Sequence, residues 1–386
     1  MTEERNECSD LLPDEVIDML NIFILIMSIA LALISFFLTG QVRKYAISRH
    51  ILDIPNERSS HVVVTPRGGG LGFVVAFLLG LSILHFSGII GMHLFLALAG
   101  GGVLLAVIGW KDDKHGLTPR VRSFFHFLAA SWAVYWLGGF PAVNVGFTDL
   151  YFSWVGSIIG VIGTVWMINL YNFMDGVDGI AGTEAVSVAL ICGILLFGSK
   201  SPGPAAVCFL LAASVLGFLM WNWPPARIFM GDVGSGFLGF VFAVMAMWTE
   251  ISGVLPFIIW MILLGVFIID ATVTLIKRSA RGERLYEAHR SHVYQLAVQA
   301  GYSHKQVTCT VLLINVLLGL ISISALKHID LLLDISIGVA VMLIIAHTIL
   351  SHRFNVKITK MNAVSKIAET EGHLSYAEVA ALKDDK

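Results

Sequence analysis

The chain has 386 residues, of which 56% are hydrophobic and only 13% are charged, and its mean hydropathy is +0.81. This composition excludes a soluble globular enzyme, because soluble domains carry about one quarter charged residues. The four cysteines lack metal-ligand or redox spacing, which excludes a disulfide-stapled secreted domain. With a formal net charge of −2, no nucleic-acid partner is expected.

Apolar runs of about 20 residues, enough to cross about 30 Å of hydrocarbon, occur about eleven times along the chain. They cover residues 16–38, 69–86, 91–110, 124–140, 154–170, 180–197, 205–221, 236–248, 254–276, 308–326 and 331–350. We therefore predict an all-α fold, a polytopic membrane helix bundle of about eleven transmembrane helices within residues 1–352. Residues 353–386 form a charged cytoplasmic tail.

Lys and Arg residues are distributed unevenly between alternate loops. If the N-terminus lies outside, all of them except Arg5, Lys200 and Lys327 fall on the inner side. The acidic leader lacks the basic region of a signal peptide, so the first helix is expected to be retained. The pattern predicts an outer N-terminus and a cytoplasmic C-terminus.

The first inner loop, residues 53–70, places Arg58 and Arg67 before the glycine triplet that opens the second predicted helix. One interpretation is positive-inside anchoring beside a flexible helix start. The other is that the backbone N–H groups of Gly68, Gly69 and Gly70 bind an anion at a helix N-terminus. The pattern alone does not decide between them.

The second inner loop carries adjacent carboxylates, Asp112 and Asp113, at the end of the third predicted helix. Two neighbouring anions repel each other unless a cation compensates them, and Arg122 is among the basic residues that follow. A plain salt-bridge cluster would explain the pattern. A divalent-ion site, or a carboxylate that takes a proton from a substrate, explains it better.

The third inner loop spaces oxygen-bearing side chains three residues apart, at Asn169, Asn172, Asp175 and Asp178. On a helix this spacing keeps them near one face. Such a set suits a hard cation or the donor-rich edge of a base. The structural alternative is a set of helix caps and turn residues.

The fourth inner loop places Asp232 between Gly231 and Gly234, just before the eighth predicted helix. A carboxylate in this setting is often an N-cap. It gains interest because it emerges on the same side as Asp112 and Asp175. Phe229 offers an aromatic face for stacking, or an interfacial anchor.

The fifth inner loop, residues 277–295, is rich in basic residues and contains His289, Arg290 and His292. Anionic lipid attracts some of this charge. The paired histidines suggest more, because arginine forks and histidine donors grip a diphosphate. Asp270, inside the ninth predicted helix, is an intramembrane carboxylate and so is suspected of a function.

Together the inner loops gather carboxylates for a hard metal ion and basic groups for phosphates on one face of the bundle. The substrates should therefore include a phosphorylated molecule from the cytosol and a molecule delivered from the lipid. Mg²⁺ with phosphate oxygens is the expected combination.

The order of these motifs resembles the polyprenyl-phosphate N-acetylhexosamine-1-phosphate transferases of glycosyltransferase family 4, relatives of the phospho-N-acetylmuramoyl-pentapeptide transferase. The motifs are NERSSHVVVTPRGGG, DDKHGLTPR, NFMDGVDGIAG, FMGDVGS and AHRSHVYQ, and the likeness covers residues 53–295. The resemblance implies that undecaprenyl phosphate attacks the β-phosphorus of a UDP-N-acetylhexosamine. The products would be UMP and undecaprenyl-diphosphate-sugar, which initiates O-antigen or other surface polysaccharide synthesis. It further implies a multi-pass protein of the bacterial inner (plasma) membrane with a cytoplasmic active site.

The resemblance also implies roles by motif position. It makes Asn172 and Asp232 the Mg²⁺ ligands. The residues with an implied catalytic role are Asp112 and Asp113, which would face the lipid phosphate, Asp175, His289 and His292. The residues with an implied substrate-binding role are Asp178 and Phe229 for the uracil, Arg122 and Arg290 for the diphosphate or sugar, and Arg58 and Gly69. Whether one of the paired aspartates removes a proton is left open.

The fifth motif departs from that of the muramoyl enzymes, in which the histidines are consecutive. Here Arg290 and Ser291 separate His289 from His292, and the loop resembles the branch that acts on UDP-N-acetyl amino sugars. Membrane lipids are expected partners, and a homodimer is compatible with the sequence.

Two other functions fit parts of this pattern. An intramembrane prenyltransferase also uses aspartate pairs with Mg²⁺, but through DxxxD repeats and without an HRSH-type loop. An ion-coupled transporter could use Asp175 and Asp270 as ion sites. Alternating access, however, needs polar groups near the membrane midplane, whereas the reactive residues here lie in inner loops.

Overall fold

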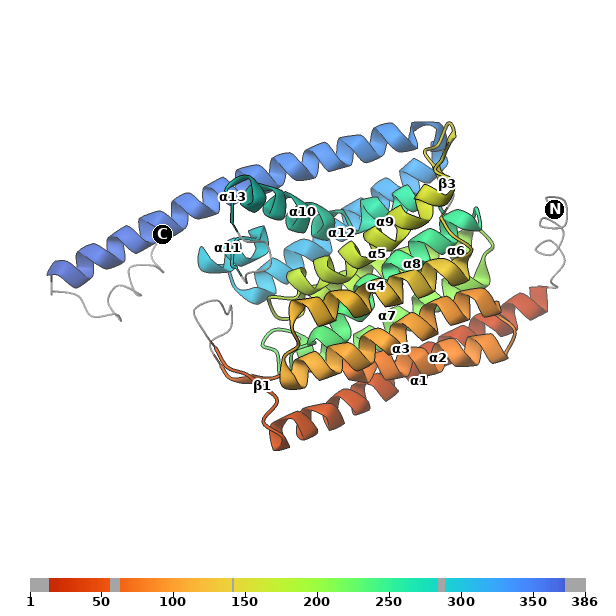
Figure 1. The fold of residues 1–386 in the computed structure, drawn as a ribbon, viewed down its shortest axis with the longest axis horizontal. Helices are drawn as coiled ribbons and strands as arrows, with labels where there is room; N and C mark the ends of the chain where they lie inside the picture. The colour runs from red at the N-terminus through yellow and green to blue at the C-terminus, as the bar shows by residue number, and fades with distance from the viewer. Residues whose placement is uncertain (1–13, 56–62, 141, 284–288, 372–386) are drawn as a thin grey trace.

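The computed structural model describes residues 14–55, 63–140, 142–283 and 289–371, and this part of the chain is mostly helical (Figure 1). Two short antiparallel hairpins accompany the helices: β1 (Leu52–Asp53) with β2 (Thr65–Pro66), and β3 (Ala142–Asn144) with β4 (Asp149–Tyr151). The helices are α1 (Asp14–Ser48), α2 (Gly70–Phe86), α3 (Met92–His115), α4 (Pro119–Leu137), α5 (Trp154–Met174), α6 (Ile180–Gly198), α7 (Pro202–Asn222), α8 (Asp232–Ile251), α9 (Phe257–Leu263), α10 (Gly265–Ala280), α11 (Val293–Gln299), α12 (His304–Lys327), a 3₁₀ turn η1 (Ile329–Leu331) and α13 (Leu332–Glu371).

The membrane helix bundle predicted from the apolar runs is confirmed. In the described part of the chain, eight helices are long and apolar enough to cross a membrane: α1, α3, α5, α6, α7, α8, α12 and the stretch 329–363. Each remaining apolar run also falls on helix, although α2 is only 17 residues long. The count of about eleven crossings stays a prediction.

The ninth apolar run departs from the expected single helix. It forms α9 and α10, which meet at Leu264 with a bend of 77° and together make one further candidate span. Hydropathy alone could not show the bend, because the apolar residues continue through it without interruption.

The ends of the elements fall at two ends of the bundle (Figure 1). α1 begins at the end where the β3–β4 hairpin lies, and β1 and α11 lie at the opposite end. α13 runs toward that second end and projects beyond the other helices. The chain thus enters the bundle at one end and leaves it at the other.

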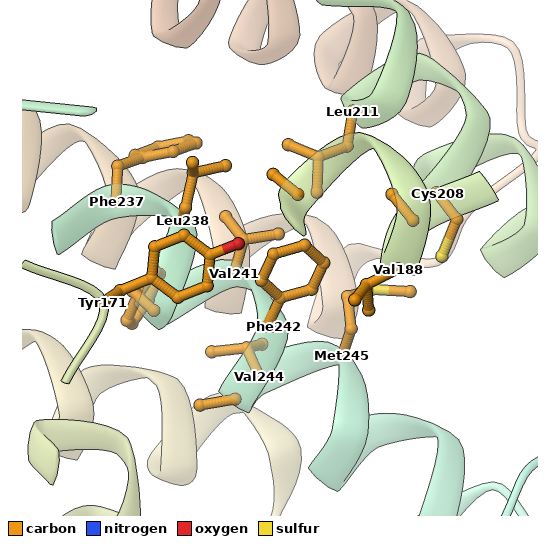
Figure 2. Packing of buried hydrophobic residues seen from close by; sticks show 14 of the residues in the cluster. Tyr171, Val188, Cys208, Leu211, Phe237, Leu238, Val241, Phe242, Val244 and Met245 are labelled. Atoms are coloured by element: carbon orange, nitrogen blue, oxygen red, sulfur yellow. The ribbon is translucent and has the colours of Figure 1, made fainter. Parts of the chain in front are cut away.

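α8 is the most buried of the long helices and forms the centre of the bundle. Its phenylalanines pack among side chains of α5, α6 and α7 (Figure 2). On its other side, Gly101 and Gly102 of α3 leave room for the rings of Phe240 and Phe237, with which a Cβ at either glycine would collide. This close approach of α3 to α8 fixes where their polar ends meet.

Candidate active site

Four helix ends from distant parts of the sequence meet at the end of the bundle where β1 and α11 lie. α3 contributes Asp112 and Asp113 near its C-terminus, and α8 begins with Asp232. α5 contributes Asn172 in its last turn, and the first turn of α4 contributes Arg122. The sequence therefore correctly anticipated that these motifs share one location.

Local turn chemistry brings α4 back to the end of α3. Gly116 ends α3 with a positive φ of 66°, which a residue without a Cβ adopts readily. Thr118 then caps α4 by accepting from Val121 N at 3.5 Å, and Pro119 occupies the first helical position. Arg122 is thereby returned to within reach of Asp112.

Arg122 bridges the aspartates of α3 and α8. Its Nη1 lies 3.1 Å from Asp112 Oδ2 and 3.2 Å from Asp232 Oδ2. Leu117 N also donates to Asp112 Oδ1, at 2.5 Å. One guanidinium thus holds together two carboxylates that are 120 residues apart in numbering and would otherwise repel each other.

Asn172 lies on the other side of Asp232. Its Nδ2 donates to Asp232 Oδ1 at 2.7 Å and to Ser235 Oγ at 3.0 Å. The two predicted Mg²⁺ ligands are therefore adjacent.

Asp113 has a different environment from its neighbour. Its carboxylate accepts from Asp232 N at 3.0 Å and from Val233 N at 3.2 Å, which caps the N-terminus of α8. Gly231 permits this contact, because its φ is 77° and a Cβ there would collide with the Asp113 carboxylate. Arg67 stabilises this contact between α3 and α8 by donating to the Asp113 backbone oxygen at 2.6 and 2.9 Å. Both side-chain oxygens of Asp113 thus accept from backbone N–H groups. Asp112 is the member of the pair that lines a pocket between the helix ends.

A polar pocket opens between these helix ends. Its lining includes Asp112, Arg122, Asn172 and Asp232, together with His126, Asn169 and Phe173. His126 and Phe173 were not singled out from the sequence, because a histidine in an apolar run and a phenylalanine between polar motif residues carry no signal of their own.

Negative charge exceeds positive charge around this pocket. Four carboxylates lie close enough to interact, those of Asp112, Asp113, Asp175 and Asp232. In the described part of the chain, the arginines paired with them are Arg67 and Arg122. The surplus of carboxylates favours a cation at this place.

Asp175 follows the last residue of α5. Burial, and then repulsion from Asp232, Asp113 and Asp178, raises the pKa of the Asp175 carboxyl well above its usual range. A carboxyl in such surroundings is neutral unless a cation lies beside it.

Asp178 is already engaged within the protein. Its Oδ2 accepts from Ala226 N at 3.0 Å, and its Oδ1 lies 3.2 Å from Nδ1 of His304, at the start of α12. Its backbone oxygen accepts from Thr308 at 2.9 Å. Asp178 therefore ties α6 and α12 to the loop before α8, and its contact with a uracil ring stays a prediction. His304 was missed because it lies beyond the five polar motifs, in a short polar stretch that resembles any helix start.

The HRSH segment, residues 289–292, contacts the site through α5 and α10. The buried His292 lies with its Nδ1 3.5 Å from Asp270 Oδ1, and its ring stacks on that of Phe173, with centroids 6.5 Å apart. Tyr294 Oη donates to the Phe173 backbone oxygen at 2.8 Å. Asp270 also accepts from Val293 N at 3.0 Å and so caps α11, which gives a structural reason for a carboxylate inside an apolar run.

His289 lies at the edge of this segment. Burial, and then the neighbouring His292 and Arg278, lowers the pKa of its imidazole to about 4. His289 is therefore a neutral hydrogen-bonding group near pH 7, and fixed positive charge in this motif comes from Arg290.

The expected anion contact of the glycine triplet is wrong for Gly69 and Gly70. Their N–H groups donate to the backbone oxygens of Phe229 and Met230, at 2.9 and 2.8 Å. Gly70 is needed for packing, since a Cβ there would lie 2.5 Å from Gly234 Cα. Phe229 is held in turn through its own N–H, 2.8 Å from Pro66 O. Arg58 lies outside the described residues.

Comparison with known proteins gives a consistent result. Residues 95–250 match the model of glycosyl transferase family 4. The chain is 29% identical over 294 residues to a probable undecaprenyl-phosphate N-acetylglucosaminyl 1-phosphate transferase of Bacillus subtilis, covering 75% of this chain and 80% of the relative.

Other relatives have similar names and coverage. A decaprenyl-phosphate N-acetylglucosaminephosphotransferase of Mycobacterium tuberculosis is 28% identical over 77% of this chain and 80% of its own length. An undecaprenyl-phosphate alpha-N-acetylglucosaminyl 1-phosphate transferase of Yersinia pestis is 28% identical over 73% of this chain and 78% of its own length. The matched region runs from α3 to α8 and so contains both predicted metal ligands. From α3 to α8 the chain is thus similar to glycosyl transferase family 4.

Proposed function

We propose that this protein transfers an N-acetylhexosamine 1-phosphate from a UDP-sugar to undecaprenyl phosphate, releasing UMP and starting the assembly of a surface polysaccharide. The observation that carries the proposal is the shared pocket of Asp112, Asn172 and Asp232 at one end of a membrane helix bundle. The names of the relatives, which specify a polyprenyl phosphate and N-acetylglucosamine, favour N-acetylglucosamine as the sugar.

The proposed reaction is an in-line displacement at phosphorus. An oxygen of the lipid phosphate forms a bond to the β-phosphorus, and the bond from that phosphorus to the oxygen bridging it to the α-phosphorus breaks. UMP leaves with the bridging oxygen. The attacking group is already an anion, so the main barrier is the approach of like charges, which positioned cations lower.

The residues of the pocket fit Mg²⁺. Carboxylate and amide oxygens are hard donors, and the surplus of carboxylates calls for a cation. No three Asp, Glu, His or Cys side chains form a ready cage among the described residues, which suits Mg²⁺, because this ion usually takes one or two carboxylates with waters and substrate phosphates.

Asp232 would hold the ion together with Asn172, whose carboxamide turned about its last bond presents Oδ1 instead of Nδ2. When bound, Mg²⁺ would neutralise charge on the diphosphate and orient it. Arg122, already between Asp112 and Asp232, would hold the phosphates from the other side. Asp112 would position the lipid phosphate, and Asp175 and the HRSH segment would complete the wall toward the sugar nucleotide.

We further propose that the chain crosses the bacterial inner membrane eleven times, with the N-terminus outside and this pocket on the cytoplasmic face. The support is the positive-inside rule, because Arg67, Lys111 and Arg122 belong to the same end of the bundle as the pocket. A UDP-sugar made in the cytosol reaches the pocket only in this orientation.

The test is UMP release by the purified protein from UDP-N-acetylglucosamine, with undecaprenyl phosphate and Mg²⁺ present. UMP should appear only when the lipid phosphate is present, and competition with other UDP-N-acetyl amino sugars then ranks the donors. A prenyltransferase would release diphosphate from a prenyl diphosphate, and a transporter would release neither. Absence of UMP with every UDP-amino sugar tested rejects the proposal.

A further inference from the structure

A second cavity lies at the same end of the bundle, between α10, α11 and α13. Its volume of about 500 Å³ is in the range of small-ligand pockets. None of its lining residues lines the pocket of Asp112 and Asp232. It is therefore a separate cavity, although Ser291 in its lining belongs to the HRSH segment of the proposed active site.

The wall of this cavity is basic. Lys277 of α10 and Arg281, which follows α10, line it together with His347 and His352 of α13, and the lining residues that the structure describes include no Asp or Glu. Arg281 does bind a carboxylate outside the lining, that of Glu283 at 3.0 Å, but Arg278 shares it at 2.7 Å.

Lys277 is held in place by α13. Its Nζ lies 3.4 Å from His347 Nδ1 and 3.5 Å from Thr348 Oγ1, and no described carboxylate pairs with it. An ammonium group only donates, so His347 Nδ1 accepts, and His347 Nε2 faces Asp270 Oδ1 at 3.4 Å. These two contacts leave Lys277 a third N–H for the cavity.

Hydroxyl groups complete the wall. Thr348 and Ser351 of α13 line the cavity together with Ser291 of the HRSH segment. Cations accompanied by hydroxyl donors, with no carboxylate among the described lining residues, suit the oxygens of a phosphate group.

The cavity lies at the level where α13 changes from apolar to polar. The last apolar run ends at residue 350, and the cavity is lined by the next residues, Ser351, His352 and Asn355. This is the depth at which lipid headgroups meet the hydrocarbon.

We propose that the cavity between α10, α11 and α13 is a second, non-catalytic site that binds a phosphate group at the membrane surface. A lipid headgroup or free phosphate could supply this group, and the two share the chemistry that the wall recognises. The site does not depend on the proposed reaction, and its test measures binding and not turnover.

The experiment is native mass spectrometry of the delipidated, detergent-purified full chain, titrated with phosphatidylglycerol or with a diacylglycerol of the same acyl chains. A parallel thermal unfolding series adds inorganic phosphate instead of lipid. The variants are Lys277→Ala and Ser351→Glu, which remove a cation from the cavity or add an anion to it. Their matched controls are Lys360→Ala and Asn362→Glu, which make the same charge changes on exposed positions of α13 beyond the cavity.

The wild type and both controls should hold one phosphatidylglycerol in preference to diacylglycerol. Lys277→Ala should weaken this binding about fivefold, as loss of one basic residue near a membrane surface does, and Ser351→Glu by at least as much. Protection by inorganic phosphate with the same variant pattern would identify free phosphate as a ligand as well. Equal effects of the cavity variants and their controls, or equal binding of the two lipids, would overturn the proposal, and either result can occur whether or not UMP is released.

Discussion

At the scale of single residues, the adjacent aspartates at the end of α3 have separate tasks. Asp113 caps α8 through two backbone N–H groups, whereas Asp112 contacts Arg122 and lines the pocket. Sequence adjacency suggested a pair acting together, because side-chain direction at a helix end cannot be read from spacing alone.

This division predicts different defects for the two positions. Asp113→Ala should lower the free energy of unfolding by about 1–2 kcal/mol, the usual cost of a lost helix cap. Asp112→Asn should reduce UMP release with little change in the unfolding temperature. Thermal unfolding and turnover measured on both variants check this, and equal loss of stability in the two would contradict it.

Asp232 is predicted to be essential for turnover. Asp232→Asn keeps the backbone N–H that Asp113 binds, so the fold should survive while the proposed metal ligand is lost. UMP release should fall on the order of 10²- to 10³-fold, with unchanged elution on gel filtration. Asp330→Asn, at an exposed position of η1, is the matched control. Full activity of Asp232→Asn would refute its metal role.

His289 predicts a pH dependence of stability. Its pKa falls from 6.5 to about 4 on folding, so the unfolded chain binds the proton more tightly. Protonation therefore favours unfolding, and stability that is complete above pH 6.5 is lost as the pH falls toward 4. His289→Gln should lose less stability than the wild type over this interval when unfolding temperatures are compared. If the unfolding temperatures of the wild type and His289→Gln fall in parallel as the pH is lowered, His289 is not the group that causes the pH dependence.

At the scale of helices, close glycine contacts set the distance between α3 and α8. Gly109 lies against the start of α8, where a Cβ would come within 2.5 Å of Val233 Cα. Gly109→Ala should therefore push apart the elements that carry Asp112 and Asp232.

The expected cost of Gly109→Ala is about 1–3 kcal/mol of stability, as in other overpacked cores, together with a loss of UMP release. Gly163→Ala on α5 is the matched control, because nothing lies within 4 Å of the added Cβ. The control should keep its activity. Equal behaviour of the two variants would show that this contact does not position the site.

Much of the fold could be predicted at this scale, and the reasons for the failures are physical. Runs of apolar residues located the helices, and ordered polar loops located Asp112, Asn172 and Asp232. The bend at Leu264, the cap that Asp270 provides and the bonds of Gly69 and Gly70 depend on neighbours distant in sequence. His304, which contacts Asp178, stands in a short polar stretch that resembles any helix start.

At the scale of the whole molecule, the proposed orientation can be measured. With native cysteines replaced by alanine, Lys114→Cys and Lys357→Cys should react with a membrane-impermeant maleimide only after the cytoplasmic face is exposed. Lys200→Cys and Asp330→Cys should react in intact cells. Labelling of Lys114→Cys from outside would overturn the topology, whatever the enzyme activity.

The length of α13 sets it apart from the other helices. Its 40 residues correspond to about 60 Å, twice the thickness of the hydrocarbon layer. The far half, which projects beyond the bundle in Figure 1, is mostly exposed from His352 to Ala363. A stiff rod of this kind acts as a spacer, so a protein fused to its far end would stand clear of the lipid surface and leave the bundle undisturbed.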